Sequence, residues 1–294
     1  MRLVTFSDSQ GARVGVHDPA ANEIVDLVAS TRLPHDMTAF VALGKKGLQR
    51  ARRAVKSGKG RIPMSQVRIL APFPRPAKNV LCVGKNYHDH AQEFHASGVD
   101  ASGKETIPEV PIIFTKWPNS VIGPGAPIPS ANDYTGSVDY EGELAVVIGE
   151  GGRNIVKKDA YDHVYGYTIV NDVSARTLQN RHRQWFLGKS PDGFCPMGPC
   201  IVTADDIEEV GELHLVTRVN GEVRQDAHVN QLIFDIPTLI ETISRVMTLE
   251  PGDLIATGTC AGVGIGFTPP KYLKKGDVVA VTIEPIGTLE NPVG

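Results

Sequence analysis

The sequence has few cysteines, and they are not arranged as a disulfide framework or a zinc site. Cys82, Cys195, Cys200 and Cys260 form no CxxC pair and show no regular spacing. We therefore expect four buried free thiols, because an unpaired cysteine is among the residue types most often found in protein interiors.

The sequence also lacks a long hydrophobic run and a leader-like beginning. No stretch approaches the ~18 consecutive apolar residues that predict a membrane-spanning helix. The opening segment, MRLVTFSDSQ, has neither the basic nor the apolar region of a signal peptide. These absences predict a cytoplasmic protein with no membrane partner.

Charge of one sign is not concentrated in any block. Thirty lysines and arginines against 33 acidic residues give a formal net charge of -3, and no basic run is long enough to follow a phosphate backbone. We therefore expect no nucleic-acid partner. What the sequence does have is 294 residues with 41% hydrophobic content, enough to bury a sizeable core.

The first part of the chain predicts a small N-terminal α+β domain. Its β-like runs and its Lys- and Arg-rich helical stretch lie at 3–7, 13–17, 24–27 and about 37–57. Pro72, Pro74 and Pro76 then interrupt any regular element. The expected division is a small domain at 1–70 and a catalytic domain at 71–294.

The second part is rich in short strand-like runs separated by turns, which 30 glycines and 21 prolines supply. Strands are predicted at 79–84, 111–116, 138–149, 164–170, 198–204, 213–221, 253–258 and 277–287, and helices at about 86–95, 172–187 and 235–247. Strands and helices do not alternate regularly. The pattern therefore predicts a strand-dominated α+β fold, a mixed β-roll or barrel-like structure, and not a doubly wound sheet.

A long polar segment, HASGVDASGKETIPEVP (95–111), follows the first of these helices. Its Gly- and Ser-rich composition is typical of a mobile surface loop of the kind used as a lid. We expect the loop around 95–108 to be open or disordered without ligand and to become ordered when a dicarboxylate binds.

Two acids, Glu141 and Glu143, lie inside the apolar strand-like stretch VDYEGELAVVIG. Alternate side chains of a strand share a face, so both carboxylates can reach one point while Gly142 faces the other side. An edge strand with its acids in water is one explanation. The apolar run ELAVVIG instead favours a strand covered on both faces, where two buried like charges need a cation.

A third acid, Asp172, lies where the strand-like part of YGYTIVNDVSARTLQ passes into a helical one. By itself, an acid at such a junction is typical of a helix N-cap. Together with Glu141 and Glu143 it completes an all-oxygen trio that suits a hard cation such as Mg²⁺ or Mn²⁺. A zinc site would be expected to include His or Cys.

Six ordered motifs resemble those of the fumarylacetoacetate hydrolase family, metal-dependent enzymes that act on small keto acids. They are VGKNYHDHAQE (83–93), PIIFTKWPNSVIGP (111–124), DYEGELAVVIG (139–149), GYTIVNDVSAR (166–176), QWFLGKSPDGFCPMGP (184–199) and ATGTCAGVG (256–264). The tail GVGIGFTPPKYLKKGDVV most resembles the branch that contains oxaloacetate tautomerases and decarboxylases.

The resemblance implies a fold, a metal site and an oligomeric state. The implied fold is a mixed β-roll with a small N-terminal domain, and the implied assembly is a homodimer. Glu141, Glu143 and Asp172 match the metal ligands of the family. The implied cofactor is Mg²⁺ or Mn²⁺, with Ca²⁺ as a possible substitute in crystals.

One motif departs from the family pattern. The family commonly has GTPxGVG where this chain has GTCAGVG (258–264), so Cys260 replaces a proline. We expect the loss of proline to loosen the turn and Cys260 to affect the substrate pocket, with the metal ligands unchanged.

His90 and Glu93 form the candidate proton-transfer pair. They lie three residues apart in a helical context and therefore on one face, where the carboxylate can hold the imidazole tautomer. An exposed pair without function is the other explanation. The resemblance favours catalysis, because the family has a His–Glu dyad at the matching positions, whereas His88 and His95 match no such role.

Five more residues are candidate site residues. The resemblance implies that Lys189 binds a substrate carboxylate or an enolate oxygen and that Gln179 helps to hold the substrate. Arg176 is open between a substrate carboxylate and a structural salt bridge. Gly258 and Thr259 lie in a Gly-rich loop whose backbone N–H groups can bind a carboxylate, although such a segment is often only a turn.

These residues predict an enzyme that stabilises an enolate with a divalent metal. The substrate expected from the tail is oxaloacetate or a related short 2-keto or β-keto dicarboxylic acid, which the enzyme would tautomerise or decarboxylate. C–C hydrolysis of acylpyruvate- or fumarylpyruvate-type 2,4-dioxo acids is an alternative. A catalytically silent protein that binds metal and dicarboxylates is another.

Overall fold

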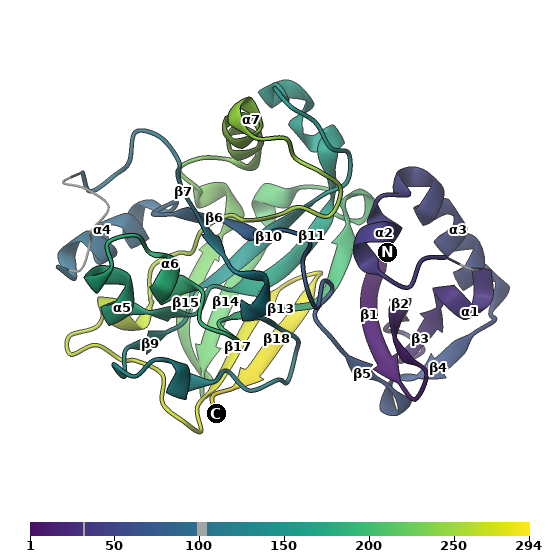
Figure 1. The fold of residues 1–294 in the computed structure, drawn as a ribbon, viewed down its shortest axis with the longest axis horizontal. Coiled ribbons are helices and arrows are strands. Elements are labelled where there is room, and N and C mark those ends of the chain that lie inside the picture. Colours follow the sequence, from purple (N-terminus) through teal and green to yellow (C-terminus); the bar gives the residue numbers. More distant parts are fainter. Residues whose placement is uncertain (32, 99–104) are drawn as a thin grey trace.

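The computed structural model describes residues 1–31, 33–98 and 105–294 as an α+β protein dominated by strands (Figure 1). The largest sheet in these residues is mixed and has twelve strands. Ten of them follow the order β4 (Arg61–Pro63), β3 (Glu23–Asp26), β2 (Gly11–Asp18), β1 (Arg2–Asp8), β13 (Cys195–Thr203), β11 (Val164–Asn171), β10 (Gly142–Ile148), β16 (Leu254–Ala256), β6 (Val80–Gly84) and β7 (Ile112–Lys116). Two short strands pair beside this path, β5 (Arg68–Ile69) with β1 and β8 (Val121–Ile122) with β13. In the described part of the chain the sheet stays open between β4 and β7, so the expected roll contains no closed barrel.

Two smaller sheets and several helices complete the fold. The four-stranded sheet has the order β15 (Glu222–His228), β14 (His214–Val219), β17 (Val278–Ile283) and β18 (Gly287–Pro292), and the two-stranded sheet pairs β12 (Ser174–Ala175) with β9 (Val138–Asp139). The α-helices are α1 (Leu27–Thr31), α2 (Met37–Val41), α3 (Gly44–Ser57), α4 (His88–Ala96), α5 (Arg176–Arg181), α6 (Phe186–Lys189) and α7 (Ile236–Val246). None of the described helices is long and apolar enough to cross a membrane. The cytoplasmic location stays a prediction.

Strands β10 and β11 form the buried centre of the large sheet. Every residue of both strands is buried, as expected of apolar runs covered on both faces. The strands pair antiparallel, with Gly142 opposite Asn171. The beginning of β10 and the end of β11 therefore lie side by side, and this edge of the sheet carries the three candidate metal ligands.

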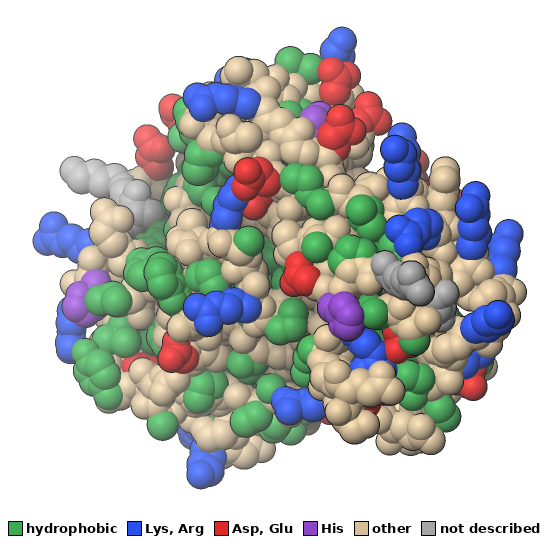
Figure 2. All heavy atoms as spheres, turned by 45° about the vertical axis from the view of Figure 1, so that its right-hand side comes forward, with side chains coloured by type: hydrophobic (Ala, Val, Ile, Leu, Met, Phe, Trp, Pro, Cys, Tyr) green, Lys and Arg blue, Asp and Glu red, His purple; other side chains and the backbone are tan. Residues whose placement is uncertain are grey.

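The N-terminal part of the chain forms a small α+β unit, seen in purple at one side of Figure 1. It joins the large sheet where β1 pairs with β13, with Arg2 opposite Val202 and Leu3 opposite Ile201. Its helix α3 buries a stripe of small residues and turns its lysines and arginines to solvent; Figure 2 shows such side chains gathered over this part of the molecule. The division of the chain at residues 70 and 71 stays a prediction.

Most of the predicted helices and strands are present, but three predicted elements are divided in the structure. The strand expected at 138–149 is split into β9 and β10, because β9 leaves the large sheet to pair with β12. The helix expected at 172–187 is split into β12, α5 and α6, and Arg183, with a positive φ of 57°, lies in the interruption. The strand expected at 277–287 is β17, with β18 returning beside it in a hairpin.

Two other segments complete the comparison with the predicted elements. Strand β15 was not predicted, because its sequence, EVRQDAH, lacks an apolar pattern. Residues 99–104, the centre of the expected lid, lie outside the described residues. The ordering of the loop around 95–108 on ligand binding therefore stays a prediction.

Candidate active site

Glu141, Glu143 and Asp172 come together as a buried trio of carboxylates. One carboxylate oxygen from each lies within 4.8 Å of the other two, and this is the one such cluster of potential metal ligands in the part of the chain that the structure describes. Glu143 is the second residue of β10, whereas Glu141 precedes the strand and Asp172 follows β11. The backbone N–H of Asp172 donates to the carbonyl of Glu141 over 2.8 Å, which fixes the two segments against each other.

The position of Glu141 departs from the expected geometry. The sequence pattern predicts two carboxylates on one face of a continuous strand, but Tyr140 and Glu141 lie between β9 and β10. The backbone N–H of Glu141 donates to Oδ1 of Asn171 over 3.0 Å instead of to a strand neighbour. The carboxylates still converge, because the irregular link turns Glu141 toward the end of β11.

Lys189 is the main counter-charge of the trio. Its Nζ lies 2.7 Å from Oε2 of Glu141 and 2.7 Å from Oδ2 of Asp172, and the side chain is buried. Burial alone lowers the pKa of a lysine, but Asp172 and Glu141 raise that of Lys189 above its usual value. Lys189 is the last residue of the short helix α6.

The two glutamates of the trio have opposite pKa shifts. Burial would raise the pKa of Glu141, but Lys189 and Arg176 outweigh it and hold the pKa well below its usual range. Burial raises the pKa of Glu143 well above its usual value, and the charges of Asp172 and Glu141 raise it further. Lys189 offsets this rise only in part, and a divalent cation would add positive charge beside Glu143.

Lys116 is a member of this cluster that the sequence analysis did not identify. It ends β7 and is fully buried, and its Nζ donates to Oδ1 of Asp172 over 2.6 Å and to the carbonyl of Val173 over 3.0 Å. It also donates to the carbonyl of Lys189. The available signal was a lysine directly after the apolar run PIIFT, where a strand leads the side chain inward.

A hollow opens beside the trio. Its lining residues are Val83, Gly84, Lys85, His90, Phe94, Glu141, Arg176, Gln179, Trp185, Lys189 and Thr259. Five of them are residues proposed from the sequence as catalytic or substrate-binding groups, namely His90, Lys189, Gln179, Arg176 and Thr259.

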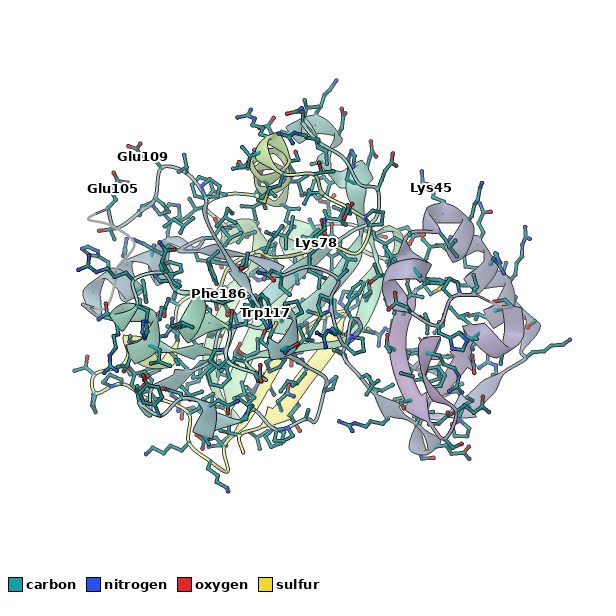
Figure 3. All side chains as sticks on the ribbon, in the orientation of Figure 1. Lys45, Lys78, Glu105, Glu109, Trp117 and Phe186 are labelled. Atoms are coloured by element: carbon teal, nitrogen blue, oxygen red, sulfur yellow. The ribbon has the colours of Figure 1, made fainter. Side chains whose placement is uncertain are left out.

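Helix α6 connects this hollow to the outer surface. Lys189 at its end points inward, whereas Phe186 at its beginning is exposed and packs edge-on against Trp117, with 6.1 Å between ring centroids. Figure 3 shows these two aromatic side chains next to each other. One side of the hollow is apolar. There Trp185 packs edge-on against Phe94 and Phe114.

His90 and Glu93 form the expected pair on α4, and it is not a solvent-exposed one. Nδ1 of His90 lies 3.3 Å from Oε2 of Glu93, and the imidazole is buried. The backbone N–H of Gly262 donates to Glu93 as well, with distances of 3.0 and 3.2 Å to its two oxygens. Glu93 thus holds the histidine ring and the Gly-rich loop together, and the Nδ1 contact leaves Nε2 of His90 as the other proton-exchanging atom.

Arg176 makes the structural salt bridges that the sequence left open, and its role toward a substrate carboxylate stays a prediction. Its Nε donates to Asp139 over 2.8 Å, and its Nη1 lies 2.6 Å from Oε1 of Glu141 and 3.2 Å from Oε1 of Gln179. Its Nη2 is buried and has no hydrogen-bond partner among the described residues. The guanidinium is therefore anchored on one side and carries an unused donor beside the hollow.

The Gly-rich loop is hydrogen-bonded to β10 through one backbone N–H and one hydroxyl. The N–H of Gly258 donates to Oε2 of Glu143 over 2.9 Å, so this N–H serves a carboxylate of the trio. The hydroxyl of Thr259 donates to the carbonyl of Gly142 over 2.9 Å. Gly258 has a φ of 104°, and a Cβ there would lie 2.7 Å from the Cβ of Asn86, so another residue would be strained and crowded. Substrate binding by Gly258 stays a prediction.

The donor set fits a hard divalent cation. It consists of carboxylate oxygens, with neither a histidine nitrogen nor a cysteine sulfur in the cluster. The distances between the ligand atoms allow one ion to contact all three, and the neighbouring Lys189 and Arg176 account for part of the negative charge. The residues present therefore fit Mg²⁺ or Mn²⁺ better than zinc.

The comparison with known protein families gives the same assignment as the motifs. The family described as fumarylacetoacetate (FAA) hydrolase, C-terminal, matches residues 79–294. The chain belongs to the fumarylacetoacetate hydrolase family. A similar member is oxaloacetate tautomerase YisK of Bacillus subtilis (strain 168), which is 49% identical over 270 residues, covering 89% of this chain and 87% of the relative.

Solved structures of the fumarylacetoacetate hydrolase family share the whole fold. A fumarylacetoacetate hydrolase from the psychrophilic Exiguobacterium antarcticum is 42% identical with a TM-score of 0.83, covering 100% of this chain and 99% of that chain. Maleylpyruvate hydrolase from Sphingobium sp. SYK-6, solved in complex with manganese(II) ion and pyruvate, is 33% identical with a TM-score of 0.79. That match covers 100% of this chain and 98% of the other.

Proposed function

We propose that this protein is a divalent-metal-dependent enzyme that interconverts the keto and enol forms of oxaloacetate through an enolate. The observation that carries the proposal is the buried trio Glu141, Glu143 and Asp172, placed beside a hollow that Lys189 and Arg176 line. Its similarity to an oxaloacetate tautomerase over nine-tenths of the chain supports the choice of substrate.

Glu141, Glu143 and Asp172 would hold Mg²⁺ or Mn²⁺. Such a cation, when bound, stabilises the negative charge that develops on the keto oxygen of a 2-keto acid. The chain contributes three buried carboxylates with one oxygen of each within 4.8 Å of the others, and the backbone segments of Glu141 and Asp172 are hydrogen-bonded to each other. Manganese in the maleylpyruvate hydrolase structure supports a divalent ion in this family fold.

Lys189 and Arg176 bind and orient the substrate in this proposal. Nζ of Lys189 is held between Glu141 and Asp172, where a substrate oxygen that gains negative charge can share its protons. Nη2 of Arg176 is available to a substrate carboxylate, and Gln179, bonded to the same guanidinium, helps to orient it. A substrate with two carboxylates matches this concentration of cations.

His90 carries the proton in this proposal. Glu93 accepts from Nδ1 in the neutral tautomer, so Nε2 is the basic atom that can remove a proton from the carbon between the keto group and the distal carboxylate. The electron pair of that C–H bond becomes the enolate, and the protonated ring returns its proton either to the enolate oxygen or to carbon. Keto and enol forms thus interconvert with no net change in atoms or charge.

Three other outcomes of the same site are tested together with this one. Loss of the β-carboxylate from the same substrate would give pyruvate. Hydrolysis of an acylpyruvate- or fumarylpyruvate-type acid, favoured by the similarity to maleylpyruvate hydrolase, would need His90 and Glu93 to activate a water. A silent protein would bind Mn²⁺ and a dicarboxylate without turnover.

The experiment supplies the purified protein with enol-oxaloacetate, keto-oxaloacetate or acetylpyruvate, with Mg²⁺ or with excess chelator. Loss of the enol absorbance faster than in buffer, without pyruvate release, would support tautomerisation. Pyruvate from oxaloacetate would instead assign decarboxylation, and pyruvate from acetylpyruvate would assign hydrolysis. Binding without any conversion would leave the silent protein.

The homodimer and the cytoplasmic location remain proposals that do not rest on the geometry of the site. They follow from the family resemblance and from the composition of the sequence. Light scattering of the purified protein tests the first, because a dimer would have twice the chain mass of 31.7 kDa. Fractionation of cells tests the second.

A further inference from the structure

Gln225 on β15 connects three segments at the back of the candidate metal site. Its side chain is 1% exposed. Its Oε1 accepts from the backbone N–H of Gly142 over 2.9 Å, and its Nε2 donates to Oγ1 of Thr259 over 2.7 Å and to the carbonyl of Cys260 over 2.8 Å. One amide group therefore links the four-stranded sheet, the beginning of β10 and the Gly-rich loop.

The orientation of this amide follows from its partners. The N–H of Gly142 can only donate and the carbonyl of Cys260 can only accept, so the oxygen of Gln225 must face Gly142 and its nitrogen must face the loop. Thr259 then accepts from Gln225 and donates its one hydroxyl proton to the carbonyl of Gly142. Gln225, Thr259 and Gly142 thus form a closed ring of hydrogen bonds.

This ring meets the chain between two of the proposed metal ligands. Gly142 separates Glu141 from Glu143, and both its N–H and its carbonyl are engaged by the ring. A Cβ on Gly142 would lie 2.3 Å from Oγ1 of Thr217, so β10 also packs tightly against the four-stranded sheet here. The orientation of the peptide groups on both sides of Gly142 decides where the two carboxylates point.

The same ring of hydrogen bonds holds the Gly-rich loop, which contacts the proposed metal ligand Glu143 and lines the hollow. Gly258, next to Thr259, donates its N–H to Glu143, and Thr259 itself lines the hollow. Because the hydroxyl proton of Thr259 is used by Gly142, the backbone of Thr259, and not its hydroxyl, is left to donate to a substrate.

We propose that Gln225 is a positioning residue that sets the direction of Glu141 and Glu143 toward the metal and the conformation of the Thr259 loop. The inference rests on the proposed function in taking these glutamates as metal ligands. Partners that hold the ligands of a metal typically change its affinity by about 10- to 100-fold when they are replaced. Gln225 is such a partner through Gly142.

The test measures the affinity for Mn²⁺ by the paramagnetic signal of the free ion, with no substrate present. Gln225→Met has a similar length and no hydrogen bonds, and we expect it to weaken Mn²⁺ binding about 10- to 100-fold. Thr259→Val opens the same ring and is expected to act in the same direction. The double variant should bind Mn²⁺ only slightly less tightly than the single variant with the lower affinity, because both changes break the same ring of hydrogen bonds.

A matched control separates positioning from general stability. Asn291 is equally buried and donates to the carbonyls of Gly123 and Ala126 over 2.9 and 2.8 Å, in a part of the fold that contributes nothing to the hollow. Asn291→Leu should lower the unfolding temperature and leave Mn²⁺ affinity within twofold of wild type. All measurements are made well below the unfolding temperature of each variant.

The outcomes separate a failure of the positioning role of Gln225 from a failure of the proposed metal site. Unchanged Mn²⁺ affinity in Gln225→Met, with a loss of stability like that of Asn291→Leu, would overturn the positioning role. If Gln225→Met does not fold, Thr259→Val, which opens the same ring, is judged by the same criterion. A wild-type protein that binds no Mn²⁺ would instead contradict the metal site itself.

Discussion

Lys116 donates a hydrogen bond of 2.6 Å to Oδ1 of Asp172, and both side chains are completely buried. Breaking a buried ion pair typically costs about 3–5 kcal/mol. Asp172 keeps Lys189 as its second ammonium partner, so the loss here should lie at the lower end of that range. We therefore predict that Lys116→Met lowers the free energy of unfolding by about that amount in the metal-free protein. Denaturant unfolding followed by circular dichroism measures the change.

The control for Lys116 is a lysine that pairs at the surface. Lys78, labelled in Figure 3, contacts Glu250 and Asp253 over 2.8 and 2.9 Å. Its side chain is 43% exposed. Exposed pairs contribute at most about 1 kcal/mol, so Lys78→Met should change the free energy of unfolding by no more than that. Equal losses in the two variants would show that the burial of Lys116 has no special consequence.

Glu143→Gln should stabilise the metal-free protein while it removes metal binding. The pKa of Glu143 is raised above its ordinary value of 4.5 by burial first and then by Asp172 and Glu141. Its favourable contribution is therefore complete below pH 4.5 and is lost as the pH rises through the folded-state pKa. We predict that metal-free Glu143→Gln unfolds at a higher temperature than wild type at neutral pH, and that the difference disappears near pH 4.

Calorimetry with and without Mn²⁺ checks this prediction. Mn²⁺ should raise the unfolding temperature of wild type and not that of Glu143→Gln, because a ligand stabilises the state that binds it. A Glu143→Gln variant that is less stable than wild type at neutral pH would show that Gly258 and the neighbouring charges already satisfy the carboxylate.

His90→Ala should reduce catalysis without weakening the metal site. A positioned acid–base group typically contributes about 10²- to 10⁴-fold to a rate, so kcat for tautomerisation should fall by that factor. Mn²⁺ affinity should change little, since His90 does not bond to the trio. His88→Ala, at an exposed position of the same helix, is the control and should retain wild-type kcat. Equal rates in the two variants would remove His90 from the mechanism.

The four cysteines should be unreactive in the folded protein. Burial raises the pKa of Cys195, Cys200 and Cys260 to about 12 and that of Cys82 well above its usual value, so almost no thiolate exists at pH 8. A chromogenic disulfide reagent should label four thiols per chain only after denaturation. Rapid labelling of one thiol in native protein would point to an open Gly-rich loop, with Cys260 as the first residue to examine.

The sequence was sufficient to predict that Glu141, Glu143 and Asp172 come together. Alternation on a strand brought Glu141 and Glu143 together, and the apolar run after them indicated burial. The actual geometry at Glu141 differs, because β9 pairs with β12 and the chain bends before β10. The convergence was predictable, since it needs only the pairing of two strand ends, whereas the bend depends on a partner strand 35 residues away.

The residues that support the trio were harder to predict. Lys116 and Gln225 lie on strands distant in sequence from the ligands, and they reach the site only through the pairing of β7 with β6 and of β15 with β14. Strand β15 itself gave no apolar pattern. A polar side chain on such a strand is predicted to be solvent-exposed as long as the packing of the four-stranded sheet against β10 is not known.

The measurement that tests the central claim most directly is the decay of enol-oxaloacetate followed by its ultraviolet absorbance. Wild-type protein is compared with Glu141→Gln and Asp172→Asn, each with Mn²⁺ and with excess chelator. The proposal predicts rapid metal-dependent conversion to the keto form by wild type and a buffer-like rate in both variants and in chelator. Conversion that persists at the wild-type rate in either variant, or in chelator, would contradict a metal-stabilised enolate at Glu141, Glu143 and Asp172.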